Sequence, residues 1–200
     1  MTKSSRSARV IAHRVLYQGF GAYEEMDVEQ ERGNGDTFRI SREYQIRSDV
    51  VAVLPFDPVR KCVRLARQLR VPLMARGDQD GFLIEVPAGH IDEGETPEES
   101  ARREAFEEVG VRLARLDPVG EVFVSPGAIT ERLSLFLAEF GEEDVHEGEG
   151  GGLDHEGEDI EILEMPLVGL EEALSRDGGI DAKTLLLLQA LRLKRPELFC

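Results

Sequence analysis

Tryptophan is absent from this sequence, cysteine occurs only twice, and aromatic residues make up 6% of the chain. Cys62 and Cys200 are too few for a disulfide framework, so we expect a reducing compartment and a cytoplasmic protein. Long apolar runs are also missing: no stretch approaches the ~20 residues of a membrane helix, and the first residues lack the apolar segment of a signal peptide. The sequence therefore predicts no membrane association.

Positive charge is scarce, because 24 Lys and Arg stand against 40 Asp and Glu, giving a net charge of −16. Binding along a nucleic acid needs an extended basic surface, so we expect no nucleic-acid partner. A small anionic substrate is compatible with this charge if metal ions and a local group of arginines offset the field.

The length of 200 residues allows one sizeable core and a small accessory lobe. Alternating apolar residues predict three antiparallel strands at 10–20, 23–30 and 37–46, with a hairpin turn at 32–36. We expect a frayed tail at 1–8, an N-terminal sheet at 9–48 and a main domain of mixed α and β structure at 49–200. Three strands form a marginal domain, so this sheet needs a partner surface.

A loop and a helix at residues 89–111 carry the strongest functional signal. Thr96 is a helix cap, Pro97 suits the first helical position, Glu99 completes a capping box, and Gly110 ends the helix.

Three carboxylates, Glu104, Glu107 and Glu108, share one face of the last turns of this helix. Like charges at this spacing repel, and anions at a helix C-terminus oppose the macrodipole. An ordinary solvated, charge-rich surface helix would explain why this helix is acidic. It would not explain why the acids are grouped at the helix C-terminus, where they are unfavourable, or why Arg103 is placed to pair with Glu107. A bound divalent cation explains both, because clustered carboxylates suit Mg²⁺ or Mn²⁺.

The same stretch resembles the Nudix box, G-x5-E-x7-R-E-U-x-E-E-x-G-U, in which U is aliphatic. Gly89, Glu95 and residues 103–111 occupy its fixed positions, and only Ala105 replaces a larger aliphatic residue. The resemblance implies an α/β/α sandwich around a mixed sheet, preceded here by the small antiparallel sheet. It also implies two or three Mg²⁺, or Mn²⁺, held by Glu104 and Glu108 with help from Glu107, while Arg103 orients Glu107 and Glu95 fixes the loop.

Two flanking segments resemble the branch of Nudix enzymes that splits nucleoside diphosphate sugars. Residues 83–89 are similar to its L-x-E-x-P-A-G segment, which implies the Ala88 carbonyl as a metal ligand and Glu85 as a contact for substrate or a metal-bound water. Residues 125–131 are similar to its S-P-G turn, which implies substrate contacts from four residues: Ser125, Gly127, Thr130 and Glu131. An ordinary turn explains the proline and glycine equally well.

Arginines supply the expected phosphate contacts, since guanidinium forks match phosphate oxygens. Arg67 and Arg70 lie in a segment that resembles the R-Q-x-R strand end of that branch, which implies that Arg67 approaches the substrate phosphates. Arg42 and Glu43 resemble a pair on the nucleoside side, although a cross-strand ion pair explains them as well.

An acidic, glycine-rich segment at 141–159 reads alone as a solvated loop, but such loops also carry catalytic groups. By resemblance, Glu158 completes the metal site and Glu156 is the expected base for the attacking water. The choice of base between Glu156 and Glu158 stays open, with Asp154 as a remote third.

The resemblance implies hydrolysis of a nucleoside diphosphate sugar to a nucleoside monophosphate and a sugar phosphate. The GDP-mannose and ADP-ribose types both fit: Gly150–Gly152 and the Asp181-Ala182-Lys183-Thr184 run favour the former, and residues 86–96 and 100–110 favour the latter. Capping explains Asp181, and Lys183 is not assigned a catalytic role. A homodimer with an exchanged N-terminal sheet is expected. The alternative is a catalytically silent Nudix fold that acts as a nucleotide sensor or protein-binding module.

Overall fold

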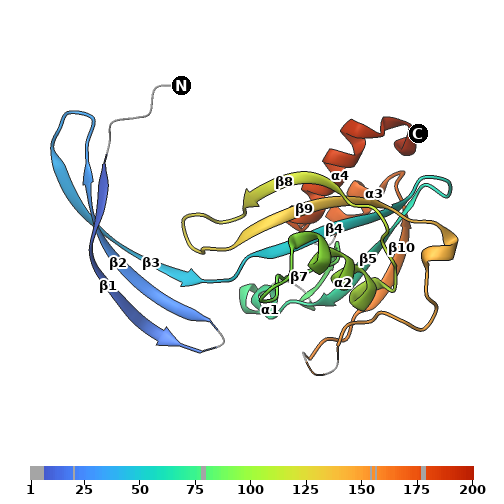
Figure 1. Cartoon of the computed structure of the whole chain (residues 1–200), viewed down its shortest axis with the longest axis horizontal. Coiled ribbons are helices and arrows are strands. Elements are labelled where there is room, and N and C mark those ends of the chain that lie inside the picture. The colour runs from blue at the N-terminus through green and yellow to red at the C-terminus, as the bar shows by residue number, and fades with distance from the viewer. Residues whose placement is uncertain (1–6, 20, 78–79, 154, 156, 177–178) are drawn as a thin grey trace. The chain divides into compact units, whose positions relative to one another are not determined.

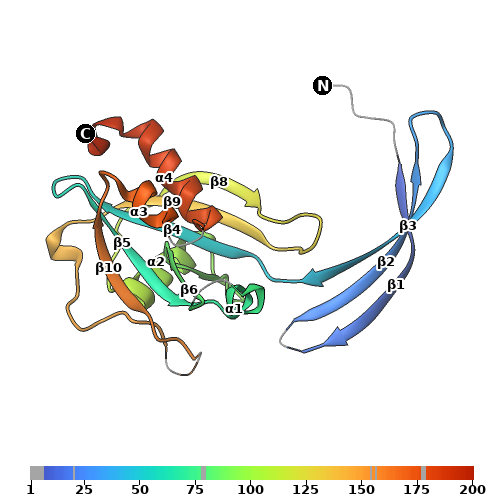
Figure 2. The ribbon, with the colours of Figure 1, turned by 180° about the vertical axis from the view of Figure 1, so that it is seen from behind.

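The computed structural model describes residues 7–19, 21–77, 80–153, 155, 157–176 and 179–200 (Figures 1 and 2). Their contacts divide the chain into two compact units. One unit comprises residues 1–48 and 123–132, and the other comprises residues 49–122 and 133–200. The predicted division placed residues 123–132 in the main domain, whereas their contacts group them with the N-terminal strands.

The N-terminal unit is built on an antiparallel sheet in the order β1-β2-β3. Its strands are β1 (Ala8–Gln18), β2 (Ala22–Glu31) and β3 (Thr37–Ile46). The turn between β2 and β3 closes with a hydrogen bond of 2.7 Å from the Arg32 N–H to the Asp36 carbonyl. Gly35 has a φ of 88°, a left-handed conformation that glycine adopts without steric cost.

Ion pairs and exposed apolar residues cover the faces of this sheet. Arg14 on β1 reaches Glu25 at 2.7 Å and Asp27 at 3.0 Å on β2. Among the described residues of β1–β3, none is fully buried, and large apolar side chains of β1 such as Val15 and Tyr17 are 56% and 67% exposed. This unit therefore has little core of its own.

The larger unit contains a mixed sheet in the order β10-β5-β4-β9-β8, with β6 on β5 and β7 on β4. Its strands are β4 (Val50–Asp57), β5 (Cys62–Leu69), β6 (Phe82–Glu85), β7 (Ala88–His90), β8 (Asp117–Phe123), β9 (Arg132–Glu139) and β10 (Glu161–Pro166). The central strands β4 and β9 run parallel. Both are nearly continuous apolar runs, as expected for strands that are covered on both faces.

Helices cover the two faces of this sheet. Alternate residues of β4 point to opposite sides: Val51 and Val53 join the core under α2 (Pro97–Val109). Ala52 and Leu54 join the core under α3 (Leu170–Ser175) and α4 (Ala182–Lys194). Figure 1 shows α2 on one face, and Figure 2 shows α3 and α4 on the other. The predicted α/β/α sandwich with a mixed sheet and a small antiparallel sheet is confirmed.

The described residues of the larger unit also include the short helical segments α1 (Val71–Arg76), η1 (Glu142–Asp144) and η3 (Pro196–Phe199). Within the described part of the chain, no helix has the length and apolar character needed to cross a bilayer.

Candidate functional site

The helix α2 begins and ends where the local sequence predicts. The Thr96 hydroxyl accepts from the Glu99 N–H at 3.3 Å, and the Thr96 N–H donates to the Glu99 carboxylate at 2.8 Å, which completes the capping box. At the other end Gly110 adopts a φ of 65°. These signals fix which side chains of α2 face the sheet, and Ala101 and Ala105 are fully buried there.

The small residues of α2 allow its carboxylates to reach the strand β7. The Ala88 N–H donates to the Glu108 carboxylate at 3.2 Å. A Cβ atom at Gly89 would lie 2.0 Å from Oε1 of Glu104, so only glycine leaves room for that carboxylate. The Glu104 and Glu108 carboxylates therefore lie beside the backbone of residues 88 and 89.

Burial makes the charged forms of these two carboxylates unfavourable. Glu104 is 9% exposed, and burial raises its pKa to about 7 although Arg103 acts in the opposite direction. Glu108 is 2% exposed, and its pKa is raised well above the usual range by burial and by the charges of Glu104 and Glu158. Two like charges held together away from water need a cation to ionise.

Arg103 connects the carboxylates of the loop and of the helix. Its guanidinium donates to Glu95 at 2.9 Å, to Glu104 at 2.7 Å and to Glu107 at 3.2 Å. The predicted pair with Glu107 is present, and a further bond reaches the His90 carbonyl at 3.0 Å. This network lowers the pKa of Glu95 to about 2, with Arg103 as the largest cause, so Glu95 and Arg103 form a fixed ion pair at neutral pH.

The donor set fits a divalent metal ion. Carboxylate oxygens and a main-chain carbonyl are the ligands that Mg²⁺ and Mn²⁺ prefer, and the buried like charges of Glu104 and Glu108 are what such an ion offsets. Within the described residues, no three Asp, Glu, His or Cys side chains already form a closed metal cage. Arg103 holds one oxygen of Glu104, and the Ala88 N–H contacts Glu108, so a bound ion has to compete with these contacts.

A buried ion-pair network lies at the end of β6. Glu85 is 2% exposed and accepts from Nε of Arg70 at 2.6 Å. Its other oxygen is paired with Lys183 of α4, which also reaches Asp181 at 3.1 Å. Burial alone raises the pKa of Glu85, but Lys183 and Arg70 together hold it below its usual value. Glu85 is therefore a charged group already paired with two cations.

The N-terminus of α4 is attached to the segment that leads into β7. The Thr184 hydroxyl donates to Asp181 at 2.7 Å and accepts from the Val86 N–H at 2.9 Å. The backbone on the way to Ala88 is thus fixed by Thr184 and, through Glu85, by Lys183.

The two arginines of the expected substrate-binding segment, Arg67 and Arg70, are both engaged in ion pairs. Arg67 reaches Asp80 at 3.2 Å and Glu161 at 3.1 Å, and its guanidinium lies 4.5 Å from the centre of the Phe82 ring. Arg70 is held by Glu85. The side chain of Arg67 is about one third exposed, so it is accessible to an anion that displaces its partners.

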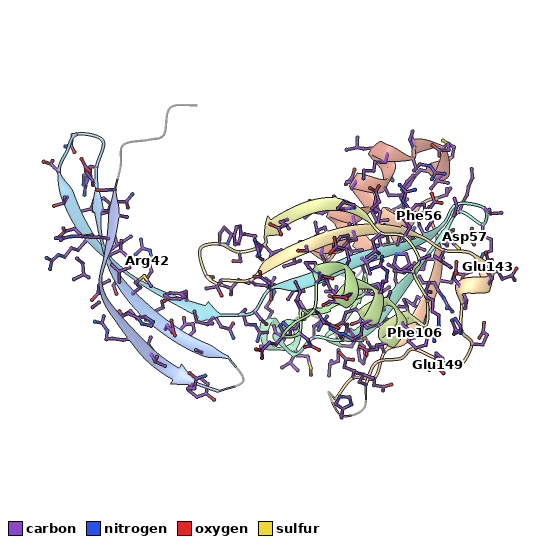
Figure 3. The ribbon with its side chains drawn as sticks, viewed as in Figure 1. Arg42, Phe56, Asp57, Phe106, Glu143 and Glu149 are labelled. Atoms are coloured by element: carbon purple, nitrogen blue, oxygen red, sulfur yellow. The ribbon has the colours of Figure 1, made fainter. Side chains whose placement is uncertain are left out.

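The remaining predicted contacts lie in the N-terminal unit, where Figure 3 labels Arg42. Arg42 donates to the Ser41 carbonyl at 2.8 Å, and Glu43 accepts from the Tyr23 hydroxyl at 3.1 Å. Residues 123–132 pair with the end of β3: the Gln45 N–H donates to the Ala128 carbonyl at 2.8 Å, and the Thr130 hydroxyl bonds to the backbone of Arg47. Ser125, Gly127, Thr130 and Glu131 therefore belong to the same unit as Arg42 and Glu43.

Comparisons with known proteins match this architecture. The model of the NUDIX domain matches residues 46–188, which include every carboxylate described above on α2. A GDP-mannose pyrophosphatase of Cronobacter sakazakii is 40% identical over 193 residues, covering 95% of this chain and 97% of the relative. Another GDP-mannose pyrophosphatase, from Pectobacterium atrosepticum, is 40% identical over 159 residues, covering 79% and 80% of the two chains.

This chain belongs to the Nudix hydrolase family. A solved structure of an ADP compounds hydrolase has the same fold, with a TM-score of 0.73 at 20% identity over 98% of both chains. The resemblance of residues 89–111 to the Nudix box is therefore confirmed. The roles expected for individual residues stay predictions.

Some contacts near these carboxylates could not be predicted from the box sequence. Lys183 was left without a role, because no local pattern shows that it reaches a glutamate 98 residues away. Thr184 was missed for the same reason. Glu158 accepts from the Leu153 N–H at 3.1 Å and is close enough to raise the pKa of both Glu104 and Glu108. Glu156 and Asp154 lie outside the described residues.

Proposed function

We propose that this Nudix protein hydrolyses the pyrophosphate bond of a nucleoside diphosphate sugar, with GDP-mannose first and ADP-ribose second among the substrates. The products are a nucleoside monophosphate and a sugar phosphate. The burial of Glu104 and Glu108 side by side next to Ala88 carries this proposal, because that arrangement is costly without a cation. The names of the relatives that match nearly the whole chain support GDP-mannose over ADP-ribose.

The proposed metal ligands are the Ala88 carbonyl and the carboxylates of Glu104, Glu108 and Glu158, with Glu107 assisting. Two or three Mg²⁺, or Mn²⁺, bound there would offset the diphosphate charge and lower the pKa of the attacking water. Arg103 positions Glu104 and Glu107 through its bonds of 2.7 and 3.2 Å.

The substrate contacts are proposed from the same set of residues. Arg67 exchanges Asp80 and Glu161 for phosphate oxygens, and Arg70 with Glu85 lies next to it in the R-Q-x-R segment. Glu156 or Glu158 acts as the base. The further proposed substrate contacts are Arg42, Glu43, Ser125, Gly127, Thr130 and Glu131. Catalysis by such a site is mainly charge neutralisation and positioning.

A substrate panel with product identification tests the proposal. GDP-mannose, ADP-ribose and a nucleoside triphosphate are incubated with Mg²⁺, and mass spectrometry identifies the products. We expect GMP and mannose 1-phosphate from GDP-mannose. The Glu108→Gln variant loses most of this turnover, whereas Glu98→Gln, an exposed carboxylate of the same helix, keeps it. Undiminished turnover in Glu108→Gln refutes the metal assignment, and no turnover across the panel favours the nucleotide sensor.

We also propose that the protein is a homodimer assembled through its N-terminal sheet. Val10, Val15, Leu16 and Tyr17 on β1 are 58%, 56%, 47% and 67% exposed. Exposed apolar side chains of this kind on a marginal three-stranded sheet suit a protein interface. The Val15→Asp, Tyr17→Asp double variant is expected to sediment as a monomer. Val59→Asp, a control at an 88% exposed valine outside this sheet, remains a dimer. A monomeric parent protein rules out this proposal.

A cytoplasmic location is proposed from the free thiols of Cys62 and Cys200. Cell fractionation tests it, and recovery of the protein from an oxidising compartment contradicts it.

A further inference from the structure

The last carbonyl groups of α2 need hydrogen-bond donors from outside the helix, because a helix leaves these acceptors without partners of its own. Here each of the last five has a partner. Ala105 and Phe106 accept from the N–H groups of Val111 and Gly110. The carbonyls of Glu107 and Glu108 accept from residues of the acidic loop: Gly152 N–H donates to Glu107 at 2.9 Å, and Gly151 N–H donates to Glu108 at 3.0 Å.

The fifth carbonyl, that of Val109, accepts from Nη1 of Arg64 on β5 at 3.1 Å. The residues that carry the metal-site carboxylates Glu107 and Glu108 are thus bonded through their backbones to a loop more than forty residues further along the chain.

Glycine is required where the loop meets the helix. A Cβ at Gly150 would lie 2.6 Å from the backbone nitrogen of Gly110 and 3.0 Å from the carbonyl carbon of Val109. A Cβ at Gly110 would lie 2.5 Å from the Glu149 carbonyl oxygen. Gly150, Gly151 and Gly152 also have φ values of 89°, 97° and 83°, which glycine adopts without steric cost. The glycine run therefore serves close backbone packing in a conformation that other residues avoid.

Contacts before the glycine run fasten the same loop to the end of α2. The His146 N–H donates to the Gly110 carbonyl at 2.9 Å, and the Arg112 N–H donates to the Asp144 carbonyl at 3.0 Å. The His146 ring meets the Phe106 ring edge to face, with centroids 5.7 Å apart. Figure 3 labels Phe106 on α2 and Glu149 on this loop.

The loop then leads directly to Glu158. The Gly151 carbonyl accepts from the N–H of the buried Ile160 at 2.9 Å, and the Leu153 N–H donates to the Glu158 carboxylate at 3.1 Å. A Cβ at Gly152 would lie 2.6 Å from Cβ of Glu158. The position of Glu158 thus depends on the same residues that bond to the end of α2.

We propose that Gly150, Gly151 and Gly152 latch the acidic loop onto the last turn of α2 and so position Glu158 against Glu104 and Glu108 for metal binding. These glycines are positioning residues, which touch neither metal nor substrate themselves. The inference rests on the proposed role of Glu158 as a metal ligand.

Two alanine substitutions in the same loop test the latch. Gly150→Ala combines a left-handed φ of 89° with the collision against Gly110. Gly148→Ala is the matched control, because Gly148 has a φ of 83° but a Cβ there would meet nothing within 4 Å. Both variants place alanine at a similar left-handed φ, and of the two only Gly150→Ala is expected to displace the loop from α2.

Mn²⁺ binding to the metal-free full-length protein is measured by electron paramagnetic resonance of the free ion, alongside the Mg²⁺ concentration for half-maximal turnover of GDP-mannose. We expect Gly150→Ala to weaken binding about tenfold or more, in the range found when groups that orient metal ligands are removed. Gly148→Ala stays within about twofold of the parent protein. If Gly150→Ala does not fold, Gly152→Ala takes its place in the same comparison.

A double-mutant cycle with Glu158→Gln separates positioning from general destabilisation. If the latch acts through Glu158, this substitution weakens Mn²⁺ binding much less in the Gly150→Ala background than in the parent. Equal binding by Gly150→Ala and Gly148→Ala overturns the inference, and so do multiplicative effects of Gly150→Ala and Glu158→Gln. A parent protein that binds Mn²⁺ in this way but hydrolyses no nucleotide sugar overturns the proposed function and leaves the latch standing.

Discussion

Replacing Glu104 by glutamine is expected to stabilise the metal-free protein at alkaline pH while it removes a metal ligand. Glu104 is buried at 9% exposure, and its pKa rises from the ordinary 4.5 to about 7, chiefly through burial. The folded state therefore favours the protonated form. The stability that this proton contributes is fully present below pH 4.5 and is lost as the pH rises to 7.

The interval between 4.5 and 7 corresponds to about 3 kcal/mol, at ~1.4 kcal/mol for each tenfold step. Glutamine has the shape of the protonated acid and keeps an oxygen that accepts from Arg103. Glutamine cannot ionise, so above pH 7 the variant does not lose the folding stability that the parent protein loses when Glu104 becomes charged. For a chain of this length, about 3 kcal/mol raises the melting temperature by roughly 6–12 °C.

Thermal unfolding with EDTA at pH 5.0 and at pH 8.5 measures this effect, with Glu98→Gln as the exposed control on the same helix. We expect Glu104→Gln to melt well above the parent at pH 8.5 and close to it at pH 5.0, and Glu98→Gln to follow the parent at both. Added Mg²⁺ stabilises the parent at pH 8.5 and has little effect on Glu104→Gln. If the melting temperature of Glu104→Gln rises equally at both pH values, or does not rise, the assignment of Glu104 as a buried carboxylate with a raised pKa is refuted.

Two further substitutions test the surroundings of this carboxylate. Gly89→Ala places a methyl group 2.0 Å from Oε1 of Glu104, so it is expected to displace that flexible side chain. We expect Mg²⁺-dependent turnover to fall about tenfold or more, while the free energy of unfolding in urea changes by less than about 1 kcal/mol. Normal turnover would contradict this. Lys183→Met leaves the buried Glu85 with Arg70 alone and is expected to cost about 3–5 kcal/mol in urea unfolding. Adding Glu85→Gln recovers part of that loss, and strictly additive losses would disprove the coupling.

The sequence predicted the helix of the site because its signals are local. The cap at Thr96, the proline at position 97 and Gly110 act within one turn, and the spacing of Glu104, Glu107 and Glu108 fixes their common face whatever surrounds them. The strands β4 and β9 carry a comparable local signal, because burial on both faces leaves a nearly continuous apolar run in each sequence.

The network around Glu85 was not predictable in the same way. A glutamate inside an apolar strand shows that some partner is needed, but it does not identify the partner. Arg70 is near in sequence and was expected to bind substrate beside Arg67, whereas Lys183 comes from the first turn of α4 and had no predicted role. The pairing arises only when the helix packs on the sheet. The docking of residues 123–132 on β3 depends likewise on chain topology, which a single sequence does not contain.

The run at residues 150–152 shows that a glycine-rich, acidic composition does not by itself identify a solvated loop. Glycine-rich, acidic segments usually remain solvated because they bury little apolar surface. In residues 150–152 the same lack of side chains permits backbone contact with the end of α2, and the N–H groups of Gly151 and Gly152 bond to the carbonyls of Glu108 and Glu107. A helix with several carboxylates at its C-terminus is destabilised by two effects: repulsion between the like charges and their unfavourable interaction with the helix macrodipole. The loop supplies N–H donors at that negative end, so the segment that carries Glu158 also offsets part of the unfavourable field in which Glu104 and Glu108 are held.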